Sequence, residues 1–264
     1  MRIEVIPTYQ GIQPLLTRDK ICIVIDILRA TSTIVTALQH GCKKIIVAAS
    51  PQEALELHKS KENYILGGES AGGLSPVFQK GNSPLEYIYG MENQSIIFVT
   101  TNGTRAITKS HKARCLAICS LLNIGAVAKW LVNCGGEGVL LCCAGTRGKL
   151  ALEDFYTAGG IIKRVADNKN NVTLSTFALF AKDFYTVAKK KYRGKIRELF
   201  QKTLNGKRLV KMGMSSDLDF CCQEDVYSIL PFCTNSVIKI REKAAPEATR
   251  IFSPPSLKGS YKNI

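Results

Sequence analysis

The sequence predicts an α/β fold in which helices cover a mostly parallel sheet. Short apolar runs bounded by polar residues, such as Ile21–Ile25 and Ile45–Ala49, are typical of strands buried on both faces. A helix signal follows the second run, because Ser50 suits the N-cap, Pro51 the first helical position and Glu53 the third. Repeated alternation of strand and helix favours a parallel sheet between helices.

The other elements continue this alternation along the chain. Strands are expected at Arg2–Ile6, Ile21–Ile25, Ile45–Ala49, Tyr64–Leu66, Ile96–Thr100, Cys115–Cys119 and Val139–Cys143. Helices are expected from Ile34, after Ser50, at Asn82–Ile88, up to His111, and at Ile124–Val132, Leu150–Val165, Thr176–Tyr192 and Ile196–Phe200. Arg29–Thr33 is expected as a loop, and Leu204–Gly206 as a helix end before a restart at Lys207–Lys211. Ser228–Pro231 and Ser236–Ile240 predict a closing hairpin.

The chain is expected to form one α/β domain over residues 1–241, with room for two closely packed lobes. Residues 242–264 are rich in Pro, Ser and Lys, which predicts a flexible tail. Gly67–Glu86 holds five glycines and two prolines, so it is expected to be a long loop, and long loops in compact domains are usually functional.

Composition restricts the classes of partner. The 264 residues carry a formal net charge of +15, which favours anionic ligands. No apolar run approaches the length of a membrane span and the first residues lack a signal peptide pattern, so a cytoplasmic protein without a membrane partner is expected. Most of the ten cysteines lie in apolar runs, so we expect buried free thiols, with the Cys142–Cys143 and Cys221–Cys222 pairs on strands. A homo-oligomer is compatible with these features.

Three strand ends carry the polar residues that matter for chemistry. Ile21–Val35, Ser95–Ile107 and Gly138–Leu152 each place an apolar run before a loop with Thr and Arg. Hydroxyls, guanidinium groups and the backbone N–H groups of a helix start together bind oxyanions. Any single loop is better explained by ordinary helix caps, but three together, each with an Arg, reverse that preference and favour a shared anion pocket. None matches the P-loop or the dinucleotide fingerprint, so nucleotide binding is not expected.

Four carboxylates stand where they could bind a hard cation at this pocket. They are Asp26 at the first strand end, Glu69 in the Gly-rich loop, and the adjacent Glu153 and Asp154. Magnesium prefers carboxylate oxygens together with water. The alternatives are an ion pair with Arg29 or a helix cap for Asp26, and a solvated helix face for the adjacent pair. Neighbouring helical residues point about 100° apart, so only one of that pair is expected to face the pocket.

A basic segment offers a different kind of site. Lys163–Lys211 holds 14 Lys and Arg residues against three acids, which is compatible with a nucleic-acid surface. Its aromatic residues Phe177, Phe180, Phe184 and Tyr185 follow helical spacing, so they are expected in the core rather than stacked on bases. We therefore favour a solvated basic face and expect no nucleic-acid partner.

At this point the motifs resemble a known family. DILRATSTIVTAL, GGESAGGLSP followed by GNSPLEY, TTNGTRA and CAGTRGKLALED occur in the order found in the 2-phosphosulfolactate phosphatase family. The later block NGKRLVKMGMSSDLDFCCQEDVYSILP is similar to the C-terminal portion of that family. The resemblance covers residues 1–240, whereas the stretch after Glu242 has no counterpart.

The resemblance implies a family-specific three-layer α/β/α fold with a mixed sheet. It also implies a magnesium-dependent phosphoric monoester hydrolase that converts (R)-2-phospho-3-sulfolactate to sulfolactate and phosphate, a step of coenzyme M biosynthesis in methanogens. The partner would be this substrate or a similar small anionic 2-phospho acid, and the cofactor Mg²⁺.

Twelve residues stand at the family's motif positions, and chemistry suggests their roles. The expected catalytic residues are Asp26, Arg147 and Asp154. The expected metal ligands are Asp26, Glu69, Glu153 and Asp154, with Asp26 together with either Glu69 or Asp154 expected to hold the magnesium. The expected substrate contacts are Arg29, Thr31, Asn82, Asn102, Thr104, Arg105 and Thr146. Attack by a metal-activated water is expected, with a covalent aspartyl-phosphate at Asp26 as the alternative. The rival from another class is a non-catalytic anion- or RNA-binding protein that uses the basic C-terminal half.

Overall fold

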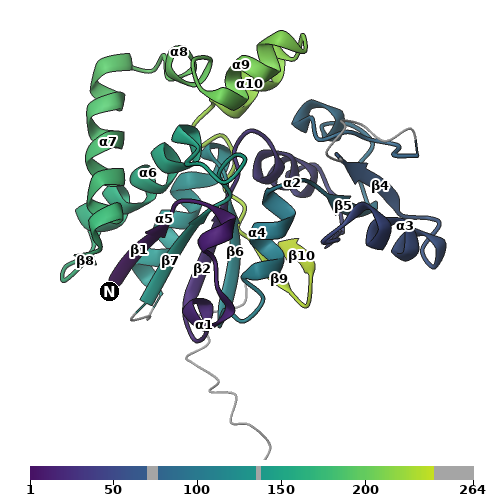
Figure 1. The fold of residues 1–264 in the computed structure, drawn as a ribbon, viewed down its shortest axis with the longest axis horizontal. Coiled ribbons are helices and arrows are strands. Elements are labelled where there is room, and N and C mark those ends of the chain that lie inside the picture. Colours follow the sequence, from purple (N-terminus) through teal and green to yellow (C-terminus); the bar gives the residue numbers. More distant parts are fainter. Residues whose placement is uncertain (70–76, 135–137, 241–264) are drawn as a thin grey trace, which may run out of the picture.

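The computed structural model describes residues 1–69, 77–134 and 138–240, and shows a ten-stranded mixed sheet between two helical layers (Figure 1). The strands are β1 Arg2–Ile6, β2 Ile21–Ile25, β3 Lys44–Val47, β4 Ile65–Gly68, β5 Ser95–Val99, β6 Cys115–Cys119, β7 Gly138–Cys143, β8 Thr173–Leu174, β9 Pro231–Thr234 and β10 Val237–Ile240. The α-helices are α1 Pro14–Thr17, α2 Ala30–Gln39, α3 Pro51–Lys59, α4 Gly103–Lys109, α5 Ile124–Asn133, α6 Leu152–Asn168, α7 Thr176–Tyr192, α8 Arg197–Phe200, α9 Leu204–Lys211 and α10 Ser215–Cys221. Short 3₁₀ turns are η1 Tyr9–Gly11, η2 Pro84–Tyr87 and η3 Leu121–Asn123. The tail predicted at 242–264 lies outside the described residues.

Two groups of parallel strands make up the sheet, in the order β4-β5-β3-β10-β9-β6-β2-β7-β1-β8. Strands β6, β2, β7, β1 and β8 are parallel to one another, as are β3, β5 and β4. The β9–β10 hairpin joins the groups through three antiparallel pairings. Each antiparallel step reverses the strand direction, so the two parallel groups run in opposite directions.

Helices cover both faces, which confirms the predicted three-layer arrangement. Strand β2 shows why its sequence is apolar without alternation: Ile21, Ile23 and Ile25 belong to the core beneath α5, α6 and α7. Cys22 and Val24 belong to the core beneath α2 and α4. A strand with both faces buried needs apolar side chains at every position.

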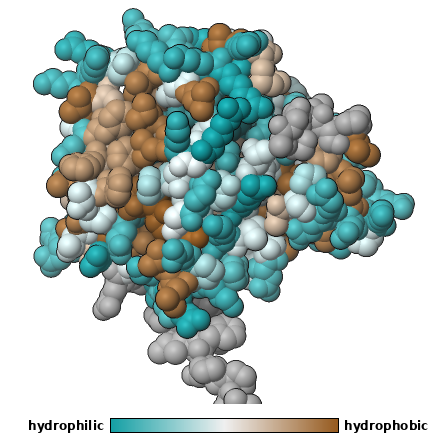
Figure 2. Space-filling view, in the orientation of Figure 1, coloured by the Kyte–Doolittle hydropathy of each residue, from teal (hydrophilic) through white to brown (hydrophobic). Residues whose placement is uncertain are grey.

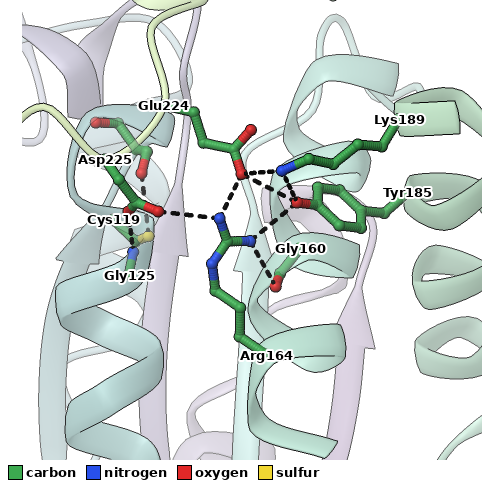
Figure 3. A network of polar contacts seen from close by, with 9 residues as sticks. Cys119, Gly125, Gly160, Arg164, Tyr185, Lys189, Glu224 and Asp225 are labelled. Atoms are coloured by element: carbon green, nitrogen blue, oxygen red, sulfur yellow. Dashed lines mark hydrogen bonds and ion pairs between the residues drawn. The ribbon is translucent and has the colours of Figure 1, made fainter. Parts of the chain in front are cut away.

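A half-buried ion network fastens the segment after α10 to this layered core (Figure 3). The guanidinium of Arg164 in α6 binds both Glu224 and Asp225. Lys189 and the hydroxyl of Tyr185, both from α7, reach the same Glu224 oxygen at 2.9 and 3.0 Å. Although burial acts in the opposite sense, Lys189 and Arg164 hold the pKa of Glu224 below its ordinary value. The network thus fixes the chain between α10 and β9.

Several predicted boundaries were wrong for local reasons. The helix expected from Ile34 begins at Ala30, because the Thr31 N–H donates to the Asp26 carbonyl at 2.8 Å and starts the turn early. Leu204–Gly206 opens α9 rather than ending a helix, since the Thr203 hydroxyl caps the Gly206 N–H. Cys221 lies in α10 and Cys222 caps it, so this pair is not on a strand. The expected hairpin is present, with β9 placed later than predicted.

The aromatic residues of α7 do not all enter the core. Tyr185 is 4% exposed and packs beneath the helix, as predicted, but Phe177 and Phe180 are 49% and 59% exposed. Apolar side chains gather over α6 and α7 at the left of the space-filling view (Figure 2). The core prediction was therefore wrong for Phe177 and Phe180, because α7 is covered from one side only. No helix in the described part of the chain is long and apolar enough to cross a membrane.

Candidate active site

A cavity of about 340 Å³ opens beside the loops that follow β1, β2, β4, β5 and β7. Helix α9 forms a further wall. The residues of the predicted site that line it are Asp26, Arg29, Glu69, Asn82, Asn102, Arg105, Thr146 and Arg147. The rest of the lining is Tyr9, Leu28, Thr101, Asn205, Arg208, Leu209 and Met212. The four predicted residues that do not line it are Thr31, Thr104, Glu153 and Asp154.

Asp26 follows β2 directly, and its carboxylate is held by backbone N–H groups. Ala30 and Gly103 donate these hydrogen bonds, so the loop after β5 meets the loop after β2 at this side chain. A Cβ at position 103 would lie 2.7 Å from Asp26 Oδ2, so only glycine allows this approach. Burial, and then the nearby charges of Glu69 and Glu153, raise the pKa of Asp26 to about 7.

Thr31 and Thr104 shape the loops from behind instead of facing the cavity. Both are fully buried. The Thr31 hydroxyl accepts the Asp26 N–H at 3.1 Å. The Thr104 hydroxyl donates to the Thr100 carbonyl at 2.9 Å and accepts the Thr100 N–H at 3.0 Å. Neither hydroxyl is a helix cap, because the N-cap residues of α2 and α4 are Arg29 and Asn102 and neither makes a side-chain cap hydrogen bond.

Arg29 is a buried cation that two acids already engage. It donates to Asp217 Oδ2 of α10 at 2.5 Å and lies 3.6 Å from Glu69 Oε2. The other oxygen of Asp217 accepts from the Ser83 hydroxyl at 2.6 Å. Asn82, the residue before Ser83, is 4% exposed and lines the cavity. Its side-chain oxygen has no hydrogen-bond partner among the described residues. Arg29 therefore connects α10 to the Gly-rich loop.

The loop after β7 is a tight turn that brings Arg147 to the cavity. Arg147 adopts a left-handed φ of 51°, and the Thr146 N–H donates to the Lys149 carbonyl at 2.8 Å. Arg147 stays exposed at the mouth of the cavity, whereas Thr146 is 9% exposed within it. Arg105, which is also exposed and lines the cavity, donates to the Tyr9 hydroxyl at 3.2 Å.

Asn205 of α9 reaches back to this turn. Its Nδ2 donates to Thr146 Oγ1 at 2.6 Å and to Glu153 Oε1 at 2.7 Å. An amide nitrogen has two hydrogens, so both are used. Because Thr146 Oγ1 accepts here, its own hydroxyl hydrogen is directed elsewhere and is available to an anion in the cavity. The other oxygen of Glu153 is buried without a partner among the described residues, and burial raises the pKa of this carboxyl.

Asp154 ties two cavity loops together from behind. Its Oδ1 accepts the Ile27 N–H at 3.0 Å, and its Oδ2 accepts the Gly145 N–H at 3.1 Å. The side chain is 2% exposed. Burial, followed by the charges of Asp26 and Glu153, raises the pKa of Asp154 well above its ordinary value. The geometry gives Asp154 a structural task in holding the loops after β2 and β7.

Comparison with known proteins places this geometry in a family. The family model described as 2-phosphosulpholactate phosphatase matches residues 6–236. The chain belongs to the 2-phosphosulfolactate phosphatase family. A protein of Symbiobacterium thermophilum named probable 2-phosphosulfolactate phosphatase is 37% identical over 226 residues, covering 84% of this chain and 95% of that protein. Proteins with the same name from Clostridium tetani (36%, covering 90% and 100%) and Thermotoga maritima (38%, covering 83% and 92%) are similarly related.

The metal ligands expected for this phosphatase family are not gathered into one cluster. Among the residues that the structure describes, no group of three or more His, Cys, Asp and Glu side chains is arranged to hold a metal ion. Asp26 and Glu69 both line the cavity, and their mutual repulsion contributes to the raised pKa of Asp26. One or two carboxylates, with waters and substrate phosphate, make a usual Mg²⁺ site. The donor set fits that kind of site.

Sequence reasoning missed the contributions of η1, α9 and α10. Tyr9, Asn205 and Arg208 line the cavity, and Asp217 pairs with Arg29 behind it. Arg208 stood in the expected helix restart and Asn205 in the expected helix end, and neither these residues nor Tyr9 and Asp217 had been assigned to the site. The resemblance of the block NGKRLVKMGMSSDLDF to the family was the available signal for α9 and α10, since it marked a motif to which no role was given.

The buried carboxyls predict how the stability of the metal-free protein depends on pH. The pKa of Asp26 rises from near 3.9 when unfolded to about 7 when folded. Between these values the folded state binds more protons, so its stability falls as pH increases, by about 1.4 kcal/mol per pH unit for one extra proton. Urea unfolding in EDTA at pH 5, 6, 7 and 8 measures this slope. Asp26→Asn should flatten it, and Asp167→Asn, at an exposed acid, should not. Stability that stays level or rises from pH 5 to 7 would contradict the assignment.

The Asn205 contacts predict a coupled effect on anion binding. Asn205→Ala and Thr146→Val should each weaken inorganic phosphate binding about tenfold, because Thr146→Val removes the hydroxyl donor and Asn205→Ala removes the amide that orients it. The double variant should lose no more than the larger single loss, since the two residues act through one hydrogen bond. Calorimetric titration measures these affinities, with Asn168→Ala at the exposed end of α6 as control. Additive losses would show that Asn205 does not act through Thr146.

Proposed function

We propose that this chain hydrolyses the phosphate ester of (R)-2-phospho-3-sulfolactate, or of a similar small anionic 2-phospho acid, in a Mg²⁺-dependent reaction that gives sulfolactate and phosphate. Membership of the family supports this reaction, and the names of the relatives point to the same substrate. The chemistry of the cavity is the observation that supports it independently.

That cavity combines two carboxylates with guanidinium groups that no acid engages. Arg105, Arg147 and Arg208 have no ion-pair partner among the described residues, in contrast to Arg29. Phosphosulfolactate carries a phosphate, a sulfonate and a carboxylate. Guanidinium groups bind such planar or tetrahedral oxyanions through paired N–H donors. Three arginine side chains without an ion-pair partner among the described residues therefore suit a substrate with several acid groups.

Asp26 and Glu69 are the proposed ligands of the cation. Asp154 was the alternative second ligand, but it lies outside the cavity lining. Bound there, Mg²⁺ would neutralise charge on the phosphoryl group and lower the pKa of a coordinated water. Between the two arrangements expected from sequence, the pair of Asp26 and Glu69 is thus favoured.

The side chains of the chain itself bind and orient the ester. Arg147, Arg105 and the Thr146 hydroxyl would hold acidic oxygens as charge moves onto them in the transition state. The Ala30 and Gly103 N–H groups keep the Asp26 carboxylate in one orientation. We propose direct attack of water on phosphorus in line with the leaving C2 oxygen, which takes up a proton as the P–O bond breaks.

Turnover of synthetic phosphosulfolactate tests the proposed function. Purified protein should release phosphate with Mg²⁺, stop in EDTA and recover when Mg²⁺ is restored. Asp26→Asn removes a ligand charge and Arg147→Ala removes a phosphate donor, so each should lower kcat/KM by about 10³-fold or more. Asp167→Asn is the matched surface control. Absence of turnover on any small phosphoester, with tight and salt-sensitive RNA binding, would overturn the enzyme assignment.

Rapid quenching with ³²P-labelled substrate separates the two mechanisms at Asp26. Direct attack by water predicts that no label remains on the protein at any time in the first turnover. A labelled, acid-stable and hydroxylamine-sensitive protein species would instead establish an aspartyl-phosphate. Asp26→Asn is the control for the site of labelling.

A further inference from the structure

One face of α9 forms a wall of the cavity. Asn205, Arg208, Leu209 and Met212 line the cavity from this helix. Their spacings of three, four and seven residues from Asn205 correspond to one side of an α-helix. The helix is held against the site at its start, because Asn205 donates to Thr146 and Glu153 while the Thr203 hydroxyl caps Gly206. Gly206 itself packs against the Phe200 carbonyl, where a Cβ would approach to 1.9 Å. The wall is therefore fixed in position.

Arg208 is the cation that this wall presents. It is exposed, and no acid engages it within the described part of the chain. It lies one helical turn beyond Asn205, the residue that contacts the Thr146 turn, and residues at this spacing have Cβ atoms about 5–6 Å apart. Its neighbours in the lining, Leu209 and Met212, are apolar. A guanidinium one helical turn from Asn205, beside apolar side chains, suits a ligand whose phosphate is bound at the Thr146 turn. The guanidinium would bind a second acid group on the carbon skeleton of that ligand.

We infer that Arg208 determines substrate specificity by holding an acid group other than the phosphate, namely the sulfonate or the carboxylate of the 2-phospho acid. This inference rests on the proposed function. It assigns Arg147 and Thr146 to the phosphate and gives Arg208 the discrimination between small phosphoesters that carry further acid groups and those that lack them. The basic residue next to it, Lys207, is exposed but does not line the cavity, which makes it a matched control on the same helix.

The test compares three substrates across four proteins. The substrates are phosphosulfolactate, 2-phospholactate (which lacks the sulfonate) and 2-sulfoethyl phosphate (which lacks the carboxylate). The proteins are the unmodified chain, Arg208→Met, Arg208→Lys and Lys207→Met. Arg208→Met should lower kcat/KM for phosphosulfolactate about 10- to 100-fold, mainly through KM, because a charged hydrogen-bonded pair is lost. For the analogue that lacks the group held by Arg208, kcat/KM of Arg208→Met should differ less than threefold from that of the unmodified chain. Arg208→Lys should have a kcat/KM for phosphosulfolactate between those of Arg208→Met and the unmodified chain. Lys207→Met should have the same kcat/KM as the unmodified chain.

Equal losses on all three substrates, or no loss on any, would overturn the inference. A binding measurement keeps it independent of turnover: in calorimetric titration with Mg²⁺, Arg208→Met should weaken sulfolactate binding at least tenfold and leave inorganic phosphate binding unchanged. If the unmodified chain hydrolyses none of the esters, the proposed function fails, while this binding difference still decides the role of Arg208. Loss of phosphate affinity in Arg208→Met would show that Arg208 binds the phosphate instead.

Discussion

The geometry of the site depends on buried carboxylates that accept backbone N–H groups from different loops. Asp154 joins the loop after β2 to the loop after β7 through Ile27 and Gly145. Asp26 joins the loops after β2 and β5 through Ala30 and Gly103. Hydrogen bonds to a charged acceptor contribute about 1.5–3 kcal/mol each, and this offsets part of the free-energy cost of desolvating the carboxylates. The raised pKa values show that the offset is incomplete. The ionised forms of these carboxyls are therefore electrostatically unfavourable, and a bound cation would stabilise them.

These contacts also explain how a mixed sheet can serve one site. The β5 group runs against the direction of the β2 group, so the ordinary rule that parallel strands end at a common edge does not bring their loops together. The loop after β5 reaches Asp26 because residue 103 is glycine, with the start of α2 also in close contact. A side chain there would meet Ala30 Cβ at 2.5 Å. The Asn-Gly-Thr-Arg motif is therefore needed for chain packing as well as for its arginine.

The sequence was informative where short-range pattern decides structure. The uninterrupted apolar run of β2 requires two buried faces, and the ends of β2, β5 and β7 supply much of the cavity lining. What could not be predicted depends on pairs far apart in the chain. Arg29 and Asp217 are 188 residues apart, and nothing local marks Asp217 as its partner. Asn205 looked like part of a helix stop because Asn-Gly favours chain reversal, yet a cap at Thr203 outweighs that preference.

The arrangement of charge around the cavity links fold to function. Arg29 is neutralised by Asp217 and Glu69, so it contributes to architecture more than to attraction of a ligand. Within the described residues, the arginines Arg105, Arg147 and Arg208 have no such partners, and the +15 net charge of the chain adds a long-range attraction for anions. Deeper in the cavity the carboxylates of Asp26 and Glu69 would repel a phosphate. An anionic ester attracted by the rim thus meets like charge where its phosphoryl group must react. In the proposed reaction a divalent cation held by these carboxylates would reverse that sign, and this is the reason for including magnesium in the proposal.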